Sequence, residues 1–85
     1  MKTLITKSGY KIIQILSRRS NVFLLTDGKT NILIDSGPKS ERRLLVKRLF
    51  ELNVNHIDFL ILTHTHFDHA ENSAFIREKY KAKVI

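Results

Sequence analysis

Short apolar runs separated by turn residues fill the first part of the chain, and this pattern is typical of β-strands. It predicts strands near residues 3–7, 11–17, 22–26 and 30–35. The dipeptide Asp27-Gly28 gives the strongest hairpin signal, because both residue types suit a tight turn between two strands. A fifth apolar run at residues 57–62 is broken only by Asp58 and has the length of a strand buried on both faces.

Two helices are expected in the second half of the chain. The first follows Gly37-Pro38, begins with Ser40 as its N-cap, and runs to about Leu52, where Asn53 ends it. Its apolar stripe consists of Leu45, Leu49 and Leu52. The second helix is expected over residues 70–81, after a capping-box-like Asp68 and Glu71, with apolar positions at Ala70, Ala74, Phe75 and Tyr80.

The chain has 85 residues, no cysteine, no internal repeat and no linker, which together predict a single unit over residues 1–85. A chain of this size buries a limited core. Its strands are apolar enough to need cover on both faces, and two helices can cover only one. We therefore expect one apolar face to stay exposed, either because the chain is a fragment of a longer protein or because it self-associates there.

The most informative segment is Thr-His-Thr-His-Phe-Asp-His-Ala-Glu-Asn, at residues 63–72. Imidazole and carboxylate groups bind zinc, manganese or iron, so His64, His66, Asp68 and His69 are candidate metal ligands. In an extended segment, residues 64, 66 and 68 project to one side, and His69 joins them where the chain turns. The segment follows a strand and precedes a helix, which is where open α/β sheets carry their sites.

Structural alternatives exist for the same residues. Asp68 alone would serve as the N-cap of the second helix, although capping and ligation can coexist on one carboxylate. The positive end of that helix would keep His69 neutral, as ligation requires. His56 lies in a connection between a helix and a strand and is expected to be an ordinary loop residue.

The pattern His-x-His-x-Asp-His after a buried strand, preceded by threonine, resembles the signature of the metallo-β-lactamase superfamily. The strands near residues 21–25 and 31–37, and the helix before the motif, are similar to the N-terminal half of that family in the same order. The resemblance implies an α+β (α/β) fold. It would be the N-terminal half of an αββα sandwich, with a mixed, mostly antiparallel sheet of about five to six strands and two helices.

The resemblance also implies a function. His64 and His66 would bind one ion, and Asp68 and His69 a second, most plausibly zinc, with iron or manganese as alternatives. A water activated by these ions would attack a small-molecule ester, thioester, lactone, amide or phosphodiester, and Asp68 would act catalytically by orienting that water. Asp35, at the end of an apolar strand, matches a family position that supports metal ligands through hydrogen bonds. A simple Asp-Ser-Gly turn is the alternative for Asp35.

Two departures from the family pattern limit this expectation. Glu71 occupies a position where many members have glycine. The remaining ligands of the family come from the second half of the fold, whereas this chain stops at Ile85. Two ligands for each ion are fewer than the three protein ligands of a typical catalytic zinc. We therefore expect the chain to be inactive alone and to need a C-terminal half or a second copy.

The net charge of +7 favours anionic partners, so a basic, non-enzymatic binding module for nucleic acid or protein is the alternative function. The basic residues are scattered over predicted helix surfaces without interleaved aromatic residues, which favours a solvated surface instead. No apolar run approaches the roughly 20 residues of a membrane span, and the N-terminus lacks the apolar core of a signal peptide. A cytoplasmic location is therefore expected.

Overall fold

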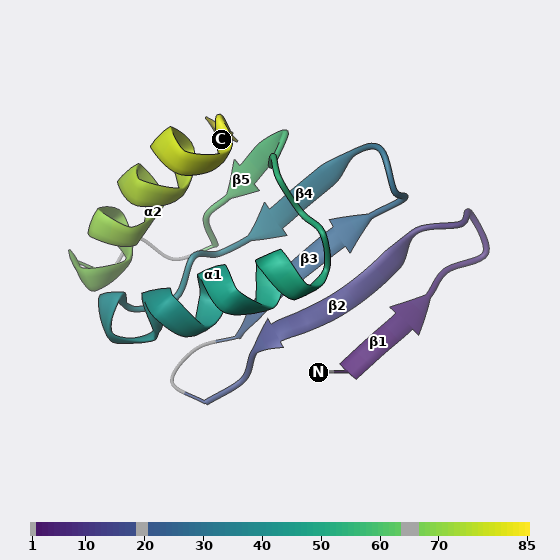
Figure 1. Ribbon diagram of the computed structural model, residues 1–85, viewed down its shortest axis with the longest axis horizontal. Coiled ribbons are helices and arrows are strands. Elements are labelled where there is room, and N and C mark those ends of the chain that lie inside the picture. The colour runs from purple at the N-terminus through teal and green to yellow at the C-terminus, as the bar shows by residue number, and fades with distance from the viewer. Residues whose placement is uncertain (1, 19–20, 64–66) are drawn as a thin grey trace.

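A six-stranded sheet with two helices makes up the structure, a computed structural model (Figure 1). It describes residues 2–18, 21–63 and 67–85, and for residues 67–71 it describes the backbone alone. The elements are β1 (Lys2–Ile5), β2 (Lys11–Leu16), β3 (Val22–Thr26), β4 (Asn31–Ile34), a 3-10 turn η1 (Lys39–Glu41), α1 (Arg42–Glu51), β5 (Phe59–Ile61), α2 (Phe67–Tyr80) and β6 (Lys83–Val84). The expected mixed sheet with two helices is confirmed.

The strands lie side by side in chain order, from β1 to β6. The first four form an antiparallel meander, while β5 runs parallel to β4 and β6 runs parallel to β5. Helix α1 connects β4 to β5, and α2 connects β5 to β6, as parallel pairing requires a crossover. The parallel half of the sheet therefore brings the C-terminal ends of β4 and β5 to the same edge.

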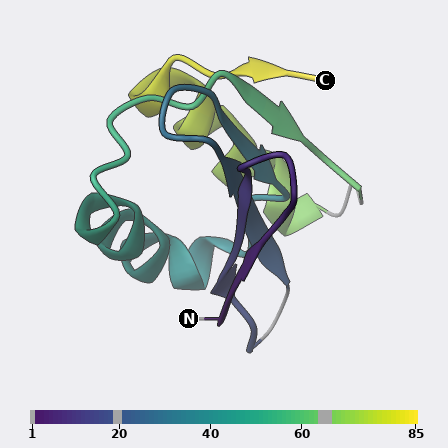
Figure 2. The same cartoon turned by 90° about the vertical axis from the view of Figure 1, so that its right-hand side faces the viewer.

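Both described helices cover the same face of the sheet (Figures 1 and 2). One row of residues in register crosses that face, and its members are between 0% and 5% exposed: Ile13, Leu24, Leu33 and Leu60. The helices contribute Leu45, Leu49, Ile76 and Tyr80 to the same core. The apolar stripe expected on α1 is confirmed, with Leu45 and Leu49 buried and Leu52 partly buried against the core.

The opposite face of the sheet is apolar as well. The register places Ile12, Leu25, Ile32 and Phe59 in one row across four strands, and Phe23, Ile34 and Ile61 in a second row. These side chains are partly buried, except that Phe59 is 36% exposed. Both described helices lie on the other side of the sheet, so β5 is covered on one face instead of the two faces that its composition predicted.

Both helix starts differ from the predicted ones. Ser40 does not cap a helix: it lies inside η1, and α1 begins at Arg42 after Glu41, which makes no side-chain capping bond. Helix α2 begins at Phe67, so Asp68 lies inside its first turn and the prediction of Asp68 as N-cap is wrong. Ala74, expected on the apolar stripe of α2, is exposed, and the buried stripe is Asn72, Ile76 and Tyr80.

Arg48 ties α1 to an irregularity in the sheet. The register between β2 and β3 shifts between Gln14 and Leu16, which indicates a β-bulge. The carbonyl oxygen of Ile15, inside this bulge, accepts a hydrogen bond from Nη1 of Arg48. A charged donor from the helix therefore satisfies a backbone group at a point where the strand pairing is irregular.

Candidate metal centre

The candidate motif begins where β5 ends, beside the end of β4. Ile34 and Ile61 are in register at the ends of these parallel strands, and the chains continue to Asp35 and to Thr63. The described chain resumes at Phe67, the first residue of α2. The motif therefore begins after the carboxyl end of β5, beside that of β4, where open α/β sheets carry their sites, while its residues 64–66 lie outside the described part of the chain.

Asp35 fastens the backbone immediately before the motif. Its backbone N–H donates to the carbonyl oxygen of Ile61 at 2.8 Å, which extends the pairing of the two strands. Its carboxylate accepts from the backbone N–H of Thr63 at 2.8 Å and from the Thr63 hydroxyl at 2.5 Å. Asp35 is 7% exposed whereas Thr63 is exposed, so both bonds are partly buried. The residue before His64 is thus held by two hydrogen bonds to one carboxylate.

The backbone of Asp35 adopts a left-handed conformation with φ of 67°. Aspartate tolerates this region better than most residues, although it still carries some strain. Here the strained conformation coincides with the two hydrogen bonds to Thr63. Strain at a buried residue persists where the surrounding contacts over-determine it, and such residues are common at functional sites.

On the other side of the motif, the side chain of Asn72 in α2 forms hydrogen bonds that hold this helix in place. Its side chain is fully buried, and its amide nitrogen lies within hydrogen-bond distance of three carbonyl oxygens in the loop after β4: Ser36 at 2.6 Å, Gly37 at 3.0 Å and Pro38 at 3.3 Å. Its amide oxygen accepts from Nε of Arg42 at 2.7 Å. One side chain therefore connects α2 with both the β4 loop and the start of α1.

Arg42 completes this junction between the two helices. Its guanidinium group donates to Asn72 and also lies over the ring of Phe75, with 4.4 Å between Cζ and the ring centroid. A cation over an aromatic face is an attractive contact. The start of α1 is thus joined to Asn72 and Phe75 on α2 by a charged hydrogen bond and a cation–π contact.

The predicted metal ligands lie largely outside the part that the structure describes. His64 and His66 fall in residues 64–66, and the side chains of Asp68 and His69 fall within residues 67–71. The backbone places Asp68 and His69 in the first turn of α2. Among the described side chains, no group of three or more His, Cys, Asp or Glu residues is arranged to hold a metal. The ligand assignment, the catalytic role of Asp68 and the effect of Glu71 therefore stay predictions.

The sequence interpretation did not include Thr63 or Asn72 in the site. Thr63 and Asn72 are the first and last residues of the segment that contains the motif, but the sequence pattern assigned neither of them a role in the site. The signal for Asn72 is its position: it lies four residues before Ile76 and eight before Tyr80, on the buried stripe of α2. An amide on such a stripe needs hydrogen-bond partners, because a buried polar group without them is costly.

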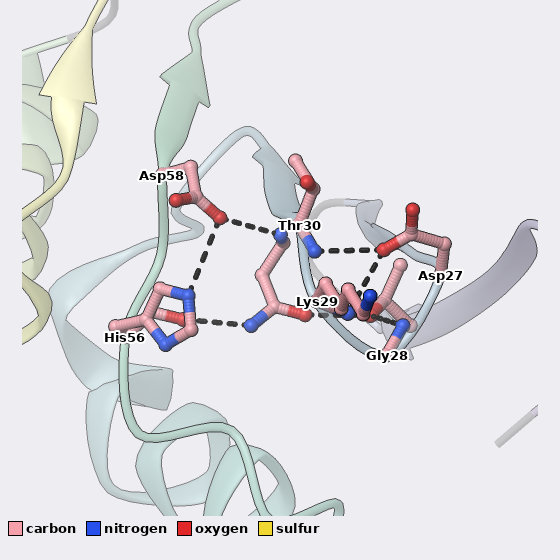
Figure 3. Close-up of polar contacts among 8 residues, drawn as sticks. Asp27, Gly28, Lys29, Thr30, His56 and Asp58 are labelled. Atoms are coloured by element: carbon pink, nitrogen blue, oxygen red, sulfur yellow. Dashed lines mark hydrogen bonds and ion pairs between the residues drawn. The ribbon is translucent and has the colours of Figure 1, made fainter.

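At the opposite end of the sheet, a second set of polar contacts joins the N-terminal ends of β4 and β5 (Figure 3). The backbone N–H of Asn31 donates to Oδ2 of Asp58 at 2.7 Å, and the Asn31 amide donates to the carbonyl oxygen of His56 at 3.0 Å. Nε2 of His56 lies 3.4 Å from Oδ2 of Asp58. His56 lies in the connection before β5 with its side chain exposed, as expected for a loop residue, and it joins this network through its backbone carbonyl and the contact with Asp58.

The turn between β3 and β4 borders this network (Figure 3). Asp27 Oδ1 accepts from the backbone N–H groups of Thr30 at 2.7 Å and Lys29 at 2.9 Å, and these two bonds lower the pKa of the Asp27 carboxyl group. Gly28 has φ of 93°, which a residue without a side chain adopts readily. The predicted hairpin at Asp27-Gly28 is confirmed by this geometry.

Neither described helix combines the length and the apolar character that crossing a membrane would require.

Comparison with known proteins agrees with the motif and with the sheet. Residues 17–85 match the sequence model of the metallo-beta-lactamase superfamily. A probable metallo-hydrolase from Methanocaldococcus jannaschii is 38% identical over 66 residues, which cover 78% of this chain and 32% of that protein. A hydroxyacylglutathione hydrolase from Pelagibacter ubique is 35% identical over 63 residues, covering 74% of this chain and 26% of that protein.

Solved structures share the fold at lower sequence identity. The apo state of the chemotaxis sensor ODP from T. denticola superposes with a TM-score of 0.80 at 21% identity, covering 98% of this chain and 35% of that one. A metallo-beta-lactamase from Cronobacter sakazakii superposes with a TM-score of 0.75 at 21% identity, covering 99% of this chain and 32% of that one. The chain thus spans between about a quarter and a third of the length of these relatives. On the match over residues 17–85, the chain belongs to the metallo-beta-lactamase superfamily.

Proposed function

We propose that this chain contributes the N-terminal half of the metal centre of a hydrolase, with His64, His66, Asp68 and His69 as ligands. The observation that carries the proposal is that hydrogen bonds hold the chain in place on both sides of the motif. Asp35 holds Thr63 just before it, and Asn72 holds α2 just after it. A metal site needs ligands that are held in place, and hydrogen bonds from neighbouring groups supply that order.

The donor set fits a divalent ion, since three imidazoles and one carboxylate are typical ligands of zinc and are also compatible with iron or manganese. A bound ion of this kind lowers the pKa of a coordinated water and polarises the group under attack. In the proposal, the histidines ligate as neutral imidazoles, and Asp68 orients the attacking water. Asp35 acts as a positioning residue, because it reaches the motif through Thr63.

We further propose that the centre takes additional ligands from residues outside this chain. The motif supplies four ligands, which gives two for each ion if two ions bind, whereas a catalytic zinc usually has three protein ligands and a water. The chain also spans only about a third of its relatives. A further histidine, aspartate and histidine encoded downstream of Ile85 would provide such a set, and their absence there would contradict this part of the proposal.

We propose that residues outside this chain, which would supply the additional ligands, also cover the sheet face that the two described helices leave open. The two apolar rows, centred on Leu25, Ile32 and Phe23, lie on the side away from both described helices. Burying apolar area is favourable at about 25 cal/mol per Å². We propose that a second layer packs there, either the C-terminal half of the domain or, when the chain is alone, a second copy.

Metal binding by the chain tests the assignment of ligands. Titration with Co²⁺, followed by its visible absorption, reports on imidazole ligands, and H64A and H66A each remove one proposed ligand. H56A is the matched control, because His56 lies at the opposite end of the sheet with Asp58. We expect the chain and H56A to bind alike, and the two motif variants to bind at least about tenfold more weakly. Equal binding by all four proteins would overturn the assignment.

Turnover separates ligand binding from catalysis. The chain alone is expected to show no hydrolysis of a lactone, a thioester or a phosphodiester with Zn²⁺ present. Activity of the isolated chain that disappears in H64A would refute the proposed need for further ligands, while it would support the metal assignment. Activity that persists in H64A would come from another source and would support neither.

A further inference from the structure

A surface groove of about 600 Å³ lies between α1 and α2. Its described lining residues are Arg42, Arg43, Val46, Lys47, Phe50, Phe75 and Lys79. A smaller cavity adjoins it, sharing Val46, Phe50 and Lys79 and adding Val54, Asn55 and Tyr80. None of the proposed metal ligands is among its described lining residues, although Arg42 and Phe75 also belong to the junction beside the motif.

Helical spacing explains how the groove is built. Arg42, Val46 and Phe50 are four residues apart on α1, so they form one stripe along that helix. Phe75 and Lys79 form the corresponding stripe on α2. Arg42 bridges the two stripes at one end, where its guanidinium group lies 4.4 Å from the centroid of Phe75. The groove is thus a continuous surface shared by two helices.

The centre of the groove is apolar and accessible. Phe50 is 77% exposed, whereas Leu45 and Leu49 on the same helix are fully buried against the sheet. A single exposed apolar residue on the outer side of a helix is common and by itself indicates little. Here, however, Phe50 is adjacent to Val46 and faces Phe75 across the groove. Grouped apolar side chains of this kind are more informative than one exposed residue.

The rim of the groove is positively charged. Arg42, Arg43, Lys47 and Lys79 contribute four of its seven lining residues, and none of the described lining residues is acidic. Of the acidic residues on the two helices whose side chains the structure describes, Glu51 and Glu78 do not line the groove. The groove therefore offers an apolar floor between cations, which complements a ligand that is apolar in the middle and negative at its edges.

We propose that this groove binds an acidic, amphipathic helical segment of a partner protein. The apolar face of such a helix would cover Val46, Phe50 and Phe75, and its flanking carboxylates would meet the lysines and arginines. Recognition of an amphipathic helix by an apolar groove between helices is a common binding mode. A nucleic acid fits less well, because it would place a continuous line of phosphates over the apolar floor.

The experiment uses a fluorescein-labelled peptide of roughly 14 residues, about four helical turns, with leucine on one face and glutamate on the other. Binding to the 85-residue chain is measured by fluorescence anisotropy, and amide shifts in NMR spectra of the labelled chain locate the contact. A scrambled peptide of the same composition tests for helical patterning. A single-stranded oligonucleotide of similar charge tests for nucleic-acid binding.

Two variants remove the two features of the groove separately. F50A removes exposed apolar surface and is matched by I5A, since Ile5 is 68% exposed on β1. K47E/K79E reverses two rim charges and is matched by K7E/K29E, which changes the same net charge at exposed turn residues. Each groove variant is expected to weaken peptide binding about tenfold or more, and each control less than about twofold.

Binding that is lost in F50A and in K47E/K79E, with shifts confined to α1 and α2, would support the proposal. Equal binding of the scrambled peptide, or equal loss in K7E/K29E, would reduce the effect to general charge attraction and overturn it. Preferential binding of the oligonucleotide in an F50A-sensitive manner would assign the groove to nucleic acid instead. Self-association abolished by F50A would assign it to a second copy, and would also overturn it.

Discussion

Replacing Asn72 by alanine should destabilise the chain more than any exposed substitution on α2, because one side chain joins three segments. The amide has two N–H groups, so at most two of its three carbonyl neighbours count fully, and the Ser36 and Gly37 oxygens are the nearer ones. Each such bond contributes about 1 kcal/mol. The bond from Arg42 involves a charge and contributes about 1.5 kcal/mol, the low end of the range, since Arg42 is partly exposed.

The expected loss from N72A is therefore about 3 to 4 kcal/mol, before any cost of the cavity is added. Folded domains are stable by about 5 to 15 kcal/mol, so this loss is a large fraction of the total. With a urea m-value of about 1 kcal/mol per M, the unfolding midpoint should fall by roughly 3 to 4 M. Circular dichroism during urea unfolding measures this shift.

E78A is the matched control, because Glu78 is an exposed residue on the same helix, and its effect should stay within about 0.5 kcal/mol. N72D is informative if N72A does not fold: it keeps the acceptor for Arg42 but removes the donors, and it brings a carboxylate against the Ser36 carbonyl. A loss below about 1 kcal/mol for N72A, or wild-type stability of N72D, would refute the reasoning, since buried carbonyls without partners are costly.

Three further predictions concern other parts of the molecule. D35N removes a charged acceptor and brings an amide N–H group toward Thr63, so it should lower stability by about 2 kcal/mol and weaken Co²⁺ binding; unchanged Co²⁺ affinity would separate Asp35 from the motif. Because backbone N–H groups, Thr30 first, hold the pKa of Asp27 below 3.8, its contribution to stability is present above that pH and is lost as pH falls through the lowered value. D27N should therefore show a smaller loss of stability between pH 6 and pH 3 in urea unfolding, and an identical loss in both proteins would contradict this. On the exposed sheet face, I32K should reduce self-association in sedimentation velocity, whereas K7E should not, and equal association of both would exclude that face as the contact.

The first five strands were predictable because they are short apolar runs separated by turn residues, whereas the two-residue strand β6 (Lys83–Val84) was not predicted. Asp27-Gly28 illustrates this, since a carboxylate that accepts local N–H groups and a glycine with positive φ form the turn without long-range help. The position of Asp35 was also predictable, as the polar residue that ends an apolar strand. Its bonds to Thr63 were not, because they join residues 28 positions apart and depend on β4 and β5 being neighbours.

The start of α1 was not predictable from local sequence. Ser40 is a good N-cap by type, but the carbonyl oxygens of Ser36, Gly37 and Pro38 point toward Asn72, and the chain makes a 3-10 turn before the regular helix. The loop before α1 thus contacts a distant helix, and this contact is not visible in the local sequence. The prediction that Ala74 lies on the apolar stripe of α2 was wrong for a related reason. The orientation of the helix on the sheet sets that stripe, which includes Asn72 instead of Ala74.

The strand order has a consequence for how the protein is made. Every strand pairs with its neighbour in the chain, so the sheet can grow in the direction of synthesis, one strand after another, as the chain leaves the ribosome. Pairing between chain neighbours keeps loop-closure costs low. The apolar row through Leu25 and Ile32 is complete once β5 has joined the sheet, and neither described helix covers it. During synthesis, this face of the growing sheet would therefore stay open to water while the opposite face is being buried.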